Sequence, residues 1–287
     1  MTAMLQRQVG IFFALIATFM ATSAAAGAAE KIVALTFDRE TNTLFMARAH
    51  ELYRSRGEDW GWTKIALPPG VQGNAIAAMA APAKRTGVLY LAGPGFGVLR
   101  SSDDGRNWVA RNDGLPSGDI VALAAHADQP DTLYAYIPGK GIFRSEDAGA
   151  HWKWMDNGPR EGIGQFIHSN MPGSMQTGWL LVATPKGVRR SMDCFCLWQD
   201  AGELAAPVNA VSYDPREPRE PRNVYAATAK GFFLSTDGGE QWTRLSAPTS
   251  RITAFAVSPA GAVYAGTADG GLYRSVDQVK SWERIGA

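Results

Sequence analysis

A unit of 43 to 45 residues occurs six times in this 287-residue chain, and the repeat restricts the possible folds more than any other feature. Each unit contains a Ser and, seven residues later, a Trp. The pairs are Ser55 and Trp62, Ser101 and Trp108, Ser145 and Trp152, Ser191 and Trp198, Ser235 and Trp242, and Ser275 and Trp282. An Asp follows the Ser by two residues at Asp103, Asp147, Asp193, Asp237 and Asp277, and a Gly follows it by four at Gly105, Gly149 and Gly239.

A second column of short apolar segments repeats with the same period. The third residues of these segments are Ala34, Ala78, Ala122, Gln165, Ala210 and Ala254. Two columns with one period define six units over residues 30–287, which leaves no room for a seventh unit or a second domain.

Each unit reads as four short strands. The third unit runs DIVALAA, TLYAY, IFRS and WKWM, with turn residues between these segments and no helical periodicity. Six such units predict an all-β fold, a six-bladed β-propeller with four antiparallel strands per blade. Because residues 31–37 form the innermost strand of the first blade, we expect no strand exchange between the chain ends. Closure of the ring would then depend on side-chain packing between blades one and six.

The Ser-x-Asp-x-Gly-x-x-Trp pattern predicts a structural turn between the third and fourth strands of a blade. Asp and Ser can accept hydrogen bonds from turn N–H groups, and Gly adopts positive φ without steric cost. The Trp ring can bury roughly 150–250 Å² and hold the turn in place.

These residues resemble the Asp-box (BNR) repeat proteins, which include sialidases, other glycoside hydrolases, the Vps10 (sortilin) domain and photosystem assembly factors. The resemblance covers residues 30–287, and the segment DTLYAYIPGKGIFRSEDAGAHW is similar to repeats of exported bacterial proteins. It implies that the boxes lie on the rim of a propeller, away from any active site.

The first residues predict export. Arg7 precedes an apolar run from Gly10 to Met20, and small residues follow with cleavage sites at Ala26 or Ala28. We therefore expect a signal peptide over residues 1–28 and a periplasmic or secreted propeller over residues 29–287. An uncleaved N-terminal anchor is the alternative. After removal of the signal, no stretch has the length of a transmembrane segment.

Charge and cysteine content exclude several classes. The chain has 28 basic and 27 acidic residues, so bulk charge does not indicate nucleic-acid binding. Two cysteines form neither a disulfide framework nor a four-thiolate zinc site. The four His residues lack ligand spacing, and we expect no metal and no cofactor.

No catalytic residue is expected. The Arg-Ile-Pro start of sialidases is replaced by Lys31, Ile32 and Val33. Five arginines recur just before the Ser of a unit, which favours a structural role: Arg54, Arg100, Arg144, Arg190 and Arg274. Other glycosidases need two facing carboxylates. The candidates for such a pair, on the face opposite the boxes, are Glu30, Asp119 and Asp269.

Cys194 and Cys196 lie inside the fourth box. In an oxidising compartment they can form a local disulfide, and idle thiols or a metal or redox site are the alternatives. The apolar string from Cys194 to Trp198 is a candidate contact patch.

Three successive blades place a Lys before the Gly of the turn between the second and third strands, at Lys140, Lys186 and Lys230. Blade two has Phe96 there. The repeat brings these turns onto one face, where three ammonium groups would form a positive arc able to bind an acidic protein segment or an anionic glycan. The alternative is that Lys simply suits an exposed turn.

These observations predict an exported, non-catalytic Asp-box propeller that serves as a protein-interaction platform or assembly factor in a bacterial envelope. A glycoside hydrolase and a lectin-like glycan binder, both using the face opposite the boxes, are the alternatives.

Overall fold

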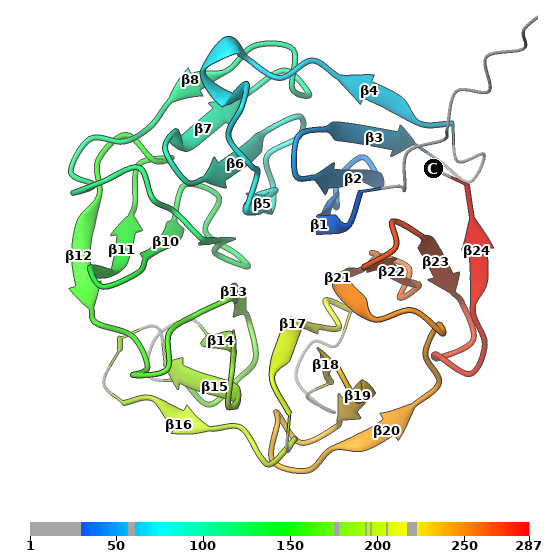
Figure 1. The fold of residues 1–287 in the computed structure, drawn as a ribbon. Coiled ribbons are helices and arrows are strands. Elements are labelled where there is room, and N and C mark those ends of the chain that lie inside the picture. The colour runs from blue at the N-terminus through cyan, green and yellow to red at the C-terminus, as the bar shows by residue number, and fades with distance from the viewer. Residues whose placement is uncertain are drawn as a thin grey trace, which may run out of the picture.

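The computed structural model describes residues 30–56, 61–174, 178–192, 194–195, 197–204, 206–216 and 223–286. Within these ranges six four-stranded antiparallel sheets surround a central axis (Figure 1). The predicted six-bladed propeller is therefore confirmed. The predicted signal peptide lies outside the described residues. No helix in the described part of the chain is long and apolar enough to cross a membrane.

The blades follow one another along the chain. Blade one contains β1 (Ile32–Asp38), β2 (Thr43–Arg48), β3 (Leu52–Arg56) and β4 (Thr63–Ile65), and the short 3-10 helix η1 (Pro69–Val71) follows it. Blade two contains β5 (Ala78–Ala80), β6 (Leu89–Gly93), β7 (Gly97–Ser101) and β8 (Val109–Ala110). Blade three contains β9 (Ala122–Ala125), β10 (Leu133–Ile137), β11 (Gly141–Ser145) and β12 (Lys153–Asp156). Blade four contains β13 (Gln165–Ser169), β14 (Trp179–Thr184), β15 (Gly187–Met192) and β16 (Gln199–Asp200). Blade five contains β17 (Val208–Tyr213), β18 (Val224–Thr228), β19 (Gly231–Ser235) and β20 (Thr243–Leu245). Blade six contains β21 (Ile252–Val257), β22 (Val263–Thr267), β23 (Leu272–Ser275) and β24 (Glu283–Ile285).

Strand order in space follows strand order in the chain, so the first strand of each blade lines the centre and the fourth runs around the circumference (Figure 1). Because neighbouring strands are antiparallel, alternate turns fall on opposite faces of the ring. We call the face with the turns between third and fourth strands the Ser–Asp face. The other face carries the links between blades and the turns between second and third strands, and we call it the link face.

The core consists of six apolar clusters, one between each pair of neighbouring blades. The cluster between blades six and one contains Ile32, Met46 and Leu272, and the rings of Phe37 and Tyr264 meet edge to face at 5.3 Å. The first and last blades therefore pack like all the others, as the sequence predicted.

Two hydrogen bonds join the ends of the chain across this same junction. The Trp62 Nε1–H donates to the Gly286 carbonyl at 2.6 Å, and the Thr253 hydroxyl donates to the Ile32 carbonyl at 2.6 Å. Both terminal sheets consist of consecutive strands, which confirms that no strand is exchanged.

The indole N–H of the repeated Trp connects neighbouring blades at the circumference in five of the six units. The indole N–H of Trp152 donates to the Arg111 carbonyl, that of Trp242 to the Ala201 carbonyl, and that of Trp282 to the Ser246 carbonyl, at 2.8 to 3.1 Å. In each case the acceptor lies at the end of the preceding blade's outer strand. Trp198 makes the equivalent bond to the Asp156 carboxylate, and Trp108 instead donates to Gly105 in its own turn.

The Ser–Asp turn has the hydrogen bonds expected from its residues. In the second blade the Ser101 hydroxyl accepts the Gly105 N–H at 2.8 Å and donates to Asp103 at 2.8 Å. Asp103 Oδ1 also accepts the backbone N–H groups of Arg106 and Asn107. Gly105 has a φ of 85°, which an L side chain rarely adopts.

The arrangement recurs in other blades with variations. Ser145 and Asp147, Ser235 and Asp237, and Ser275 and Asp277 make the same Ser-to-Asp bond at 2.6 to 2.8 Å. In blades four and six the Gly is replaced by Phe195 and Val279, which keep positive φ values of 57° and 65° and bury their side chains in the blade junction. Asp193 lies outside the described residues.

Truncation of one turn carboxylate is expected to destabilise the whole ring. Asp237 accepts the N–H groups of Glu240 and Gln241 at 2.9 and 3.0 Å. Asp237→Ala leaves these donors unpaired and should cost about 1–3 kcal/mol of unfolding free energy, measured by urea denaturation. Asp128→Ala, at an exposed turn Asp whose carboxylate has no hydrogen bond within the described residues, is the matched control and should cost under about 0.5 kcal/mol. Equal midpoints for the two variants would contradict a structural role.

The same turns predict acid sensitivity. Hydrogen bonds from Asn107, and then from Ser101, lower the pKa of Asp103 to about 2. The pKa values of Asp147 and Asp277 also lie well below the usual range, chiefly because of side-chain bonds from His151 and Ser281. A lowered folded-state pKa stabilises the protein above the unfolded value of about 3.9, and this stabilisation is lost as the pH falls through the folded-state pKa.

We therefore expect the melting temperature to fall between about pH 4 and pH 2. Asp103→Asn should lower the melting temperature at pH 7 and make the decline in acid shallower than in the wild-type protein. An unchanged slope would show that this carboxylate does not contribute to acid sensitivity.

Candidate functional site

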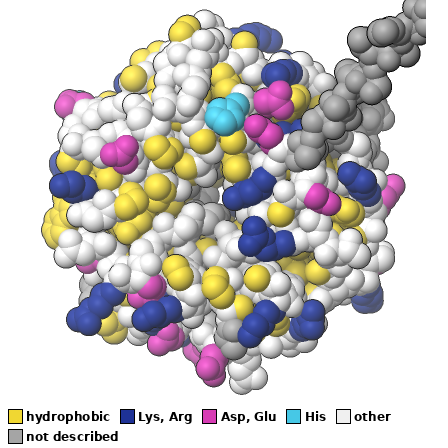
Figure 2. All heavy atoms as spheres, in the orientation of Figure 1, with side chains coloured by type: hydrophobic (Ala, Val, Ile, Leu, Met, Phe, Trp, Pro, Cys, Tyr) yellow, Lys and Arg dark blue, Asp and Glu magenta, His cyan; other side chains and the backbone are white. Residues whose placement is uncertain are grey.

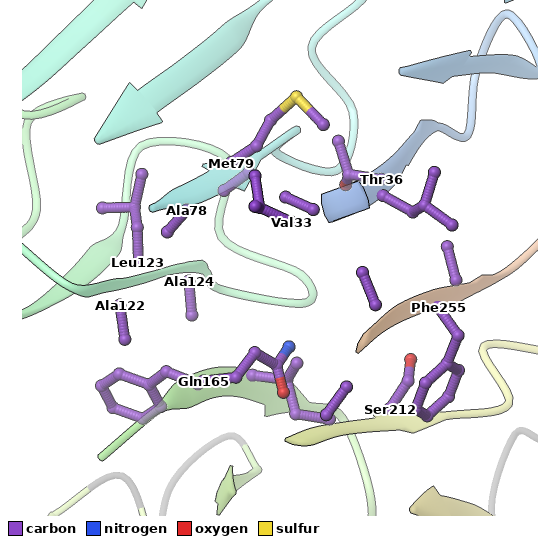
Figure 3. Close-up of a pocket in the computed structure, with 18 of the residues that line it drawn as sticks. Val33, Thr36, Ala78, Met79, Ala122, Leu123, Ala124, Gln165, Ser212 and Phe255 are labelled. Carbon is purple, nitrogen blue, oxygen red and sulfur yellow. The ribbon is translucent and has the colours of Figure 1, made fainter. Parts of the chain in front are cut away.

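The first strands of all six blades enclose a central cavity of about 420 Å³. Figure 3 shows side chains from different blades that line this space, among them Thr36, Ala124, Gln165 and Ser212. Figure 2 shows one face of the ring with a hollow at its centre and Lys or Arg side chains beside it. The cavity therefore forms a channel whose lining is set by one short segment per blade.

The channel has two chemically different walls. Blades two and three contribute only apolar side chains to the described lining, and we call the small ones among them, Ala77, Ala78, Ala80, Ala122 and Ala124, the alanine wall. Blades four, five, six and one contribute polar groups, and we call Gln165, Asn209, Ser212, Thr253 and Thr36 the polar wall. One side of the described lining is therefore apolar, and the other carries hydroxyl and amide groups among further apolar side chains.

Part of the polar wall holds neighbouring blades together. Gln165 Oε1 accepts the Val211 N–H at 2.9 Å, which joins blades four and five. Asn209 Nδ2 donates to the Ile252 carbonyl at 3.1 Å, which joins blades five and six. Because each amide uses one end of its side chain in this bond, the Gln165 amide N–H₂ and the Asn209 carbonyl keep hydrogen-bonding capacity toward the channel.

The charged residues that line the channel are two cations. Lys31 precedes β1 and Arg39 follows it, so they lie toward the link face and the Ser–Asp face, respectively. No Asp or Glu is among the described residues that line the cavity. The channel therefore offers no acid pair for glycoside hydrolysis, which needs two carboxylates about 5–9.5 Å apart.

The three acids considered for such a pair have other partners. Glu30 lies 3.4 Å from His50 Nδ1, and Asp119 accepts the Ser117 hydroxyl at 3.2 Å. Asp269 accepts the Thr267 hydroxyl within its own turn, and this bond lowers the pKa of Asp269. These contacts are those of turn and surface carboxylates.

The three lysines of the predicted arc lie on equivalent turns. Lys140, Lys186 and Lys230 are exposed and occupy the turns between the second and third strands of blades three, four and five, on the link face. The threonine hydroxyls of β14 and β18 accept the backbone N–H of Lys186 and Lys230 and shape these two turns. Phe96, at the equivalent place in blade two, is only 9% exposed and packs into the core, so blade two presents no such side chain.

Three of the five recurring arginines reach the Ser–Asp turn of the next blade, whereas Arg144 forms an ion pair with Glu146 in its own turn at 2.7 Å. Arg54 lies 3.5 Å from Asp104, and Arg190 donates to the Gly238 carbonyl at 3.1 Å. Arg100 donates to the Tyr90 hydroxyl, which donates in turn to the Ala148 carbonyl. These contacts give Arg54, Arg100 and Arg190 structural roles between blades.

The apolar string in the fourth box does not form one exposed patch. Leu197 is 63% exposed, but Phe195 is buried and packs near Tyr134 with a ring separation of 6.0 Å. The Trp198 indole is half-buried and bonded to blade three. Cys196 lies outside the described residues, and the pairing with Cys194 stays a prediction.

A second hollow, of about 470 Å³, lies beside blade one on the link face and was missed by the sequence analysis. Its lining includes Glu51, Lys64 and Val71. Glu51 accepts Lys64 Nζ at 2.6 Å and the Tyr53 hydroxyl at 2.8 Å, and the Lys64 bond is the main cause of its lowered pKa. The available signal was Glu51 itself, which stands where other blades have Gly. No cluster of metal-binding side chains occurs among the described residues.

Comparisons with known proteins identify the fold. No family model and no curated protein matches the chain. A structure of YCF48 bound to D1 peptide is 13% identical and covers 90% of this chain and 83% of that one, with a TM-score of 0.59. YCF48 from Cyanidioschyzon merolae gives 15% identity, 90% and 86% coverage, and a TM-score of 0.55. These likenesses show a β-propeller.

Glycoside hydrolases of the GH74 type share the fold as well. The Niastella koreensis GH74 enzyme is 15% identical, with a TM-score of 0.62, and covers 88% of this chain and 46% of that one. The xyloglucanase from Xanthomonas campestris is 17% identical, with a TM-score of 0.60 and coverages of 87% and 45%. This chain therefore spans less than half the length of those two enzymes.

Proposed function

We propose that this protein is an exported, non-catalytic Asp-box propeller that binds an acidic segment of a protein partner on its link face. The observation that carries the proposal is the exposed Lys on three successive equivalent turns, at Lys140, Lys186 and Lys230. Three cations on one face of a protein with a formal net charge of +1 create a local field that steers an acidic segment.

The likeness to YCF48 supports a binding role, because that propeller has been captured with a D1 peptide and covers most of this chain. The N-terminal sequence supports export, with Arg7, an apolar run and Ala-x-Ala sites in the order of a signal peptide. A periplasmic or secreted assembly factor fits both features.

The second candidate is a glycoside hydrolase or lectin-like glycan binder, supported by the likeness to GH74 enzymes. Glu30 and Asp269 both contact neighbouring side chains, which favours a non-catalytic binding protein over a hydrolase. Release of reducing sugar from xyloglucan by the purified protein would favour the hydrolase, and saturable xyloglucan binding without hydrolysis would favour the lectin.

The arc is tested with a triple variant and a labelled decaglutamate peptide. Lys140, Lys186 and Lys230 are changed together to Glu, and peptide binding is measured by fluorescence anisotropy at low salt. The dissociation constant should rise at least tenfold while the melting temperature changes little, because exposed ion pairs contribute about 0–1 kcal/mol each to stability.

The control carries the same charge change elsewhere, at Lys84, Lys153 and Lys280, which lie on the Ser–Asp face or the circumference. This control should bind the peptide nearly as well as the wild-type protein. Equal losses in the two triple variants would show that only bulk charge matters and would refute the arc.

A further inference from the structure

A guanidinium lies at the mouth of the channel on the Ser–Asp face. Arg39 follows the last residue of β1, and its Nη2 donates to the Tyr213 hydroxyl of blade five at 3.3 Å. Its Cζ also lies 5.5 Å from the centre of the Tyr213 ring. Arg39 in blade one thus reaches blade five, and both residues line the cavity.

Arg39 has no carboxylate within ion-pairing distance among the described residues. The neighbouring buried acid, Asp38, accepts the N–H groups of Glu40, Thr41 and Gly87. Asp214, beside Tyr213, is buried against Arg216 at 2.6 Å. Among the described residues, therefore, no carboxylate forms an ion pair with the guanidinium at this mouth.

The Tyr213 hydroxyl adds a second donor at the same place. It accepts a hydrogen bond from Arg39, so its own proton is available to donate. The ring is only 5% exposed, which fixes the hydroxyl at the channel mouth. A planar guanidinium and a phenol O–H side by side match the two oxygens of a carboxylate.

The lining near this mouth is mostly apolar, with His168 of blade four as the polar exception beside Tyr213 and Arg39. Phe37, Ala81, Ala125 and Val257 line the cavity at the ends of the inner strands, next to Tyr213 in the sixfold arrangement. The alanine wall continues from there toward the link face. An aliphatic chain attached to the carboxylate would bury its methylene groups against these side chains, at about 0.8 kcal/mol per group.

We propose that the channel binds a small aliphatic monocarboxylate, with the carboxylate on Arg39 and Tyr213 and the chain along the alanine wall. A volume of about 420 Å³ lies within the range of small-molecule sites. One guanidinium balances one negative charge, whereas a doubly charged phosphate would leave a charge unpaired in the channel.

The cation at the opposite mouth belongs to a separate position. Lys31 and Arg39 flank the seven residues of β1, and a strand advances about 3.3 Å per residue. The two are therefore too far apart for one small molecule to contact both. Lys31→Gln is consequently the matched control for Arg39→Gln, since each removes one cation that lines the channel.

The test measures hexanoate binding by isothermal titration calorimetry. Arg39→Gln should raise the dissociation constant of hexanoate at least tenfold, and Lys31→Gln should change it less than twofold. Hexan-1-ol, which has the chain without the charge, should bind at least tenfold more weakly than hexanoate.

Tyr213→Phe keeps the ring under Arg39 and removes only the hydroxyl. It therefore tests the second donor of the site even if Arg39→Gln does not fold. It should weaken hexanoate two- to tenfold. The proposal is overturned if wild-type protein does not bind hexanoate, if hexan-1-ol binds as tightly, or if Lys31→Gln has the larger effect.

Discussion

The ring depends on the contact between neighbouring blades, because no single four-stranded sheet covers its own apolar faces. Each junction buries one apolar cluster, and most junctions add an indole N–H that donates to the end of the preceding outer strand. The Ser–Asp turn positions that Trp. Its carboxylate and hydroxyl satisfy the turn N–H groups, so the start of the fourth strand is fixed where the indole meets the next blade.

This use of the repeated residues leaves the ends of the channel and the link face for function. The Ser–Asp turns, the arginines and the indoles make contacts within the ring. Arg39 lies where the repeat is broken, and Lys140 occupies a turn position whose residue varies between blades. Arg39 has no counterpart of the same type after the other inner strands. In a repeat protein, such departures are where binding specificity can differ without cost to the junctions.

Much of the architecture was predictable because period and turn chemistry are local properties of the sequence. The blade number, the strand order and the Ser101–Asp103 bond all follow from residues close together in the chain. The channel mouth was not predictable, since Arg39 and Tyr213 are 174 residues apart and meet only through ring closure. The burial of Phe96 was missed for a related reason: only its neighbours in blades one and two decide whether an aromatic side chain turns inward.

Closure by the bonds of Trp62 and Thr253 makes the junction between the chain ends equivalent to the others. A protein of this kind is a candidate for circular permutation. Glu30 leads into the inner strand of blade one and Gly286 follows the outer strand of blade six, so a linker crossing one sheet, about 14 Å for strands about 4.8 Å apart, would join them. New termini opened in any link between blades would then leave all six apolar clusters intact. Such permutants would synthesise the blades in a different order and still form the same folded ring.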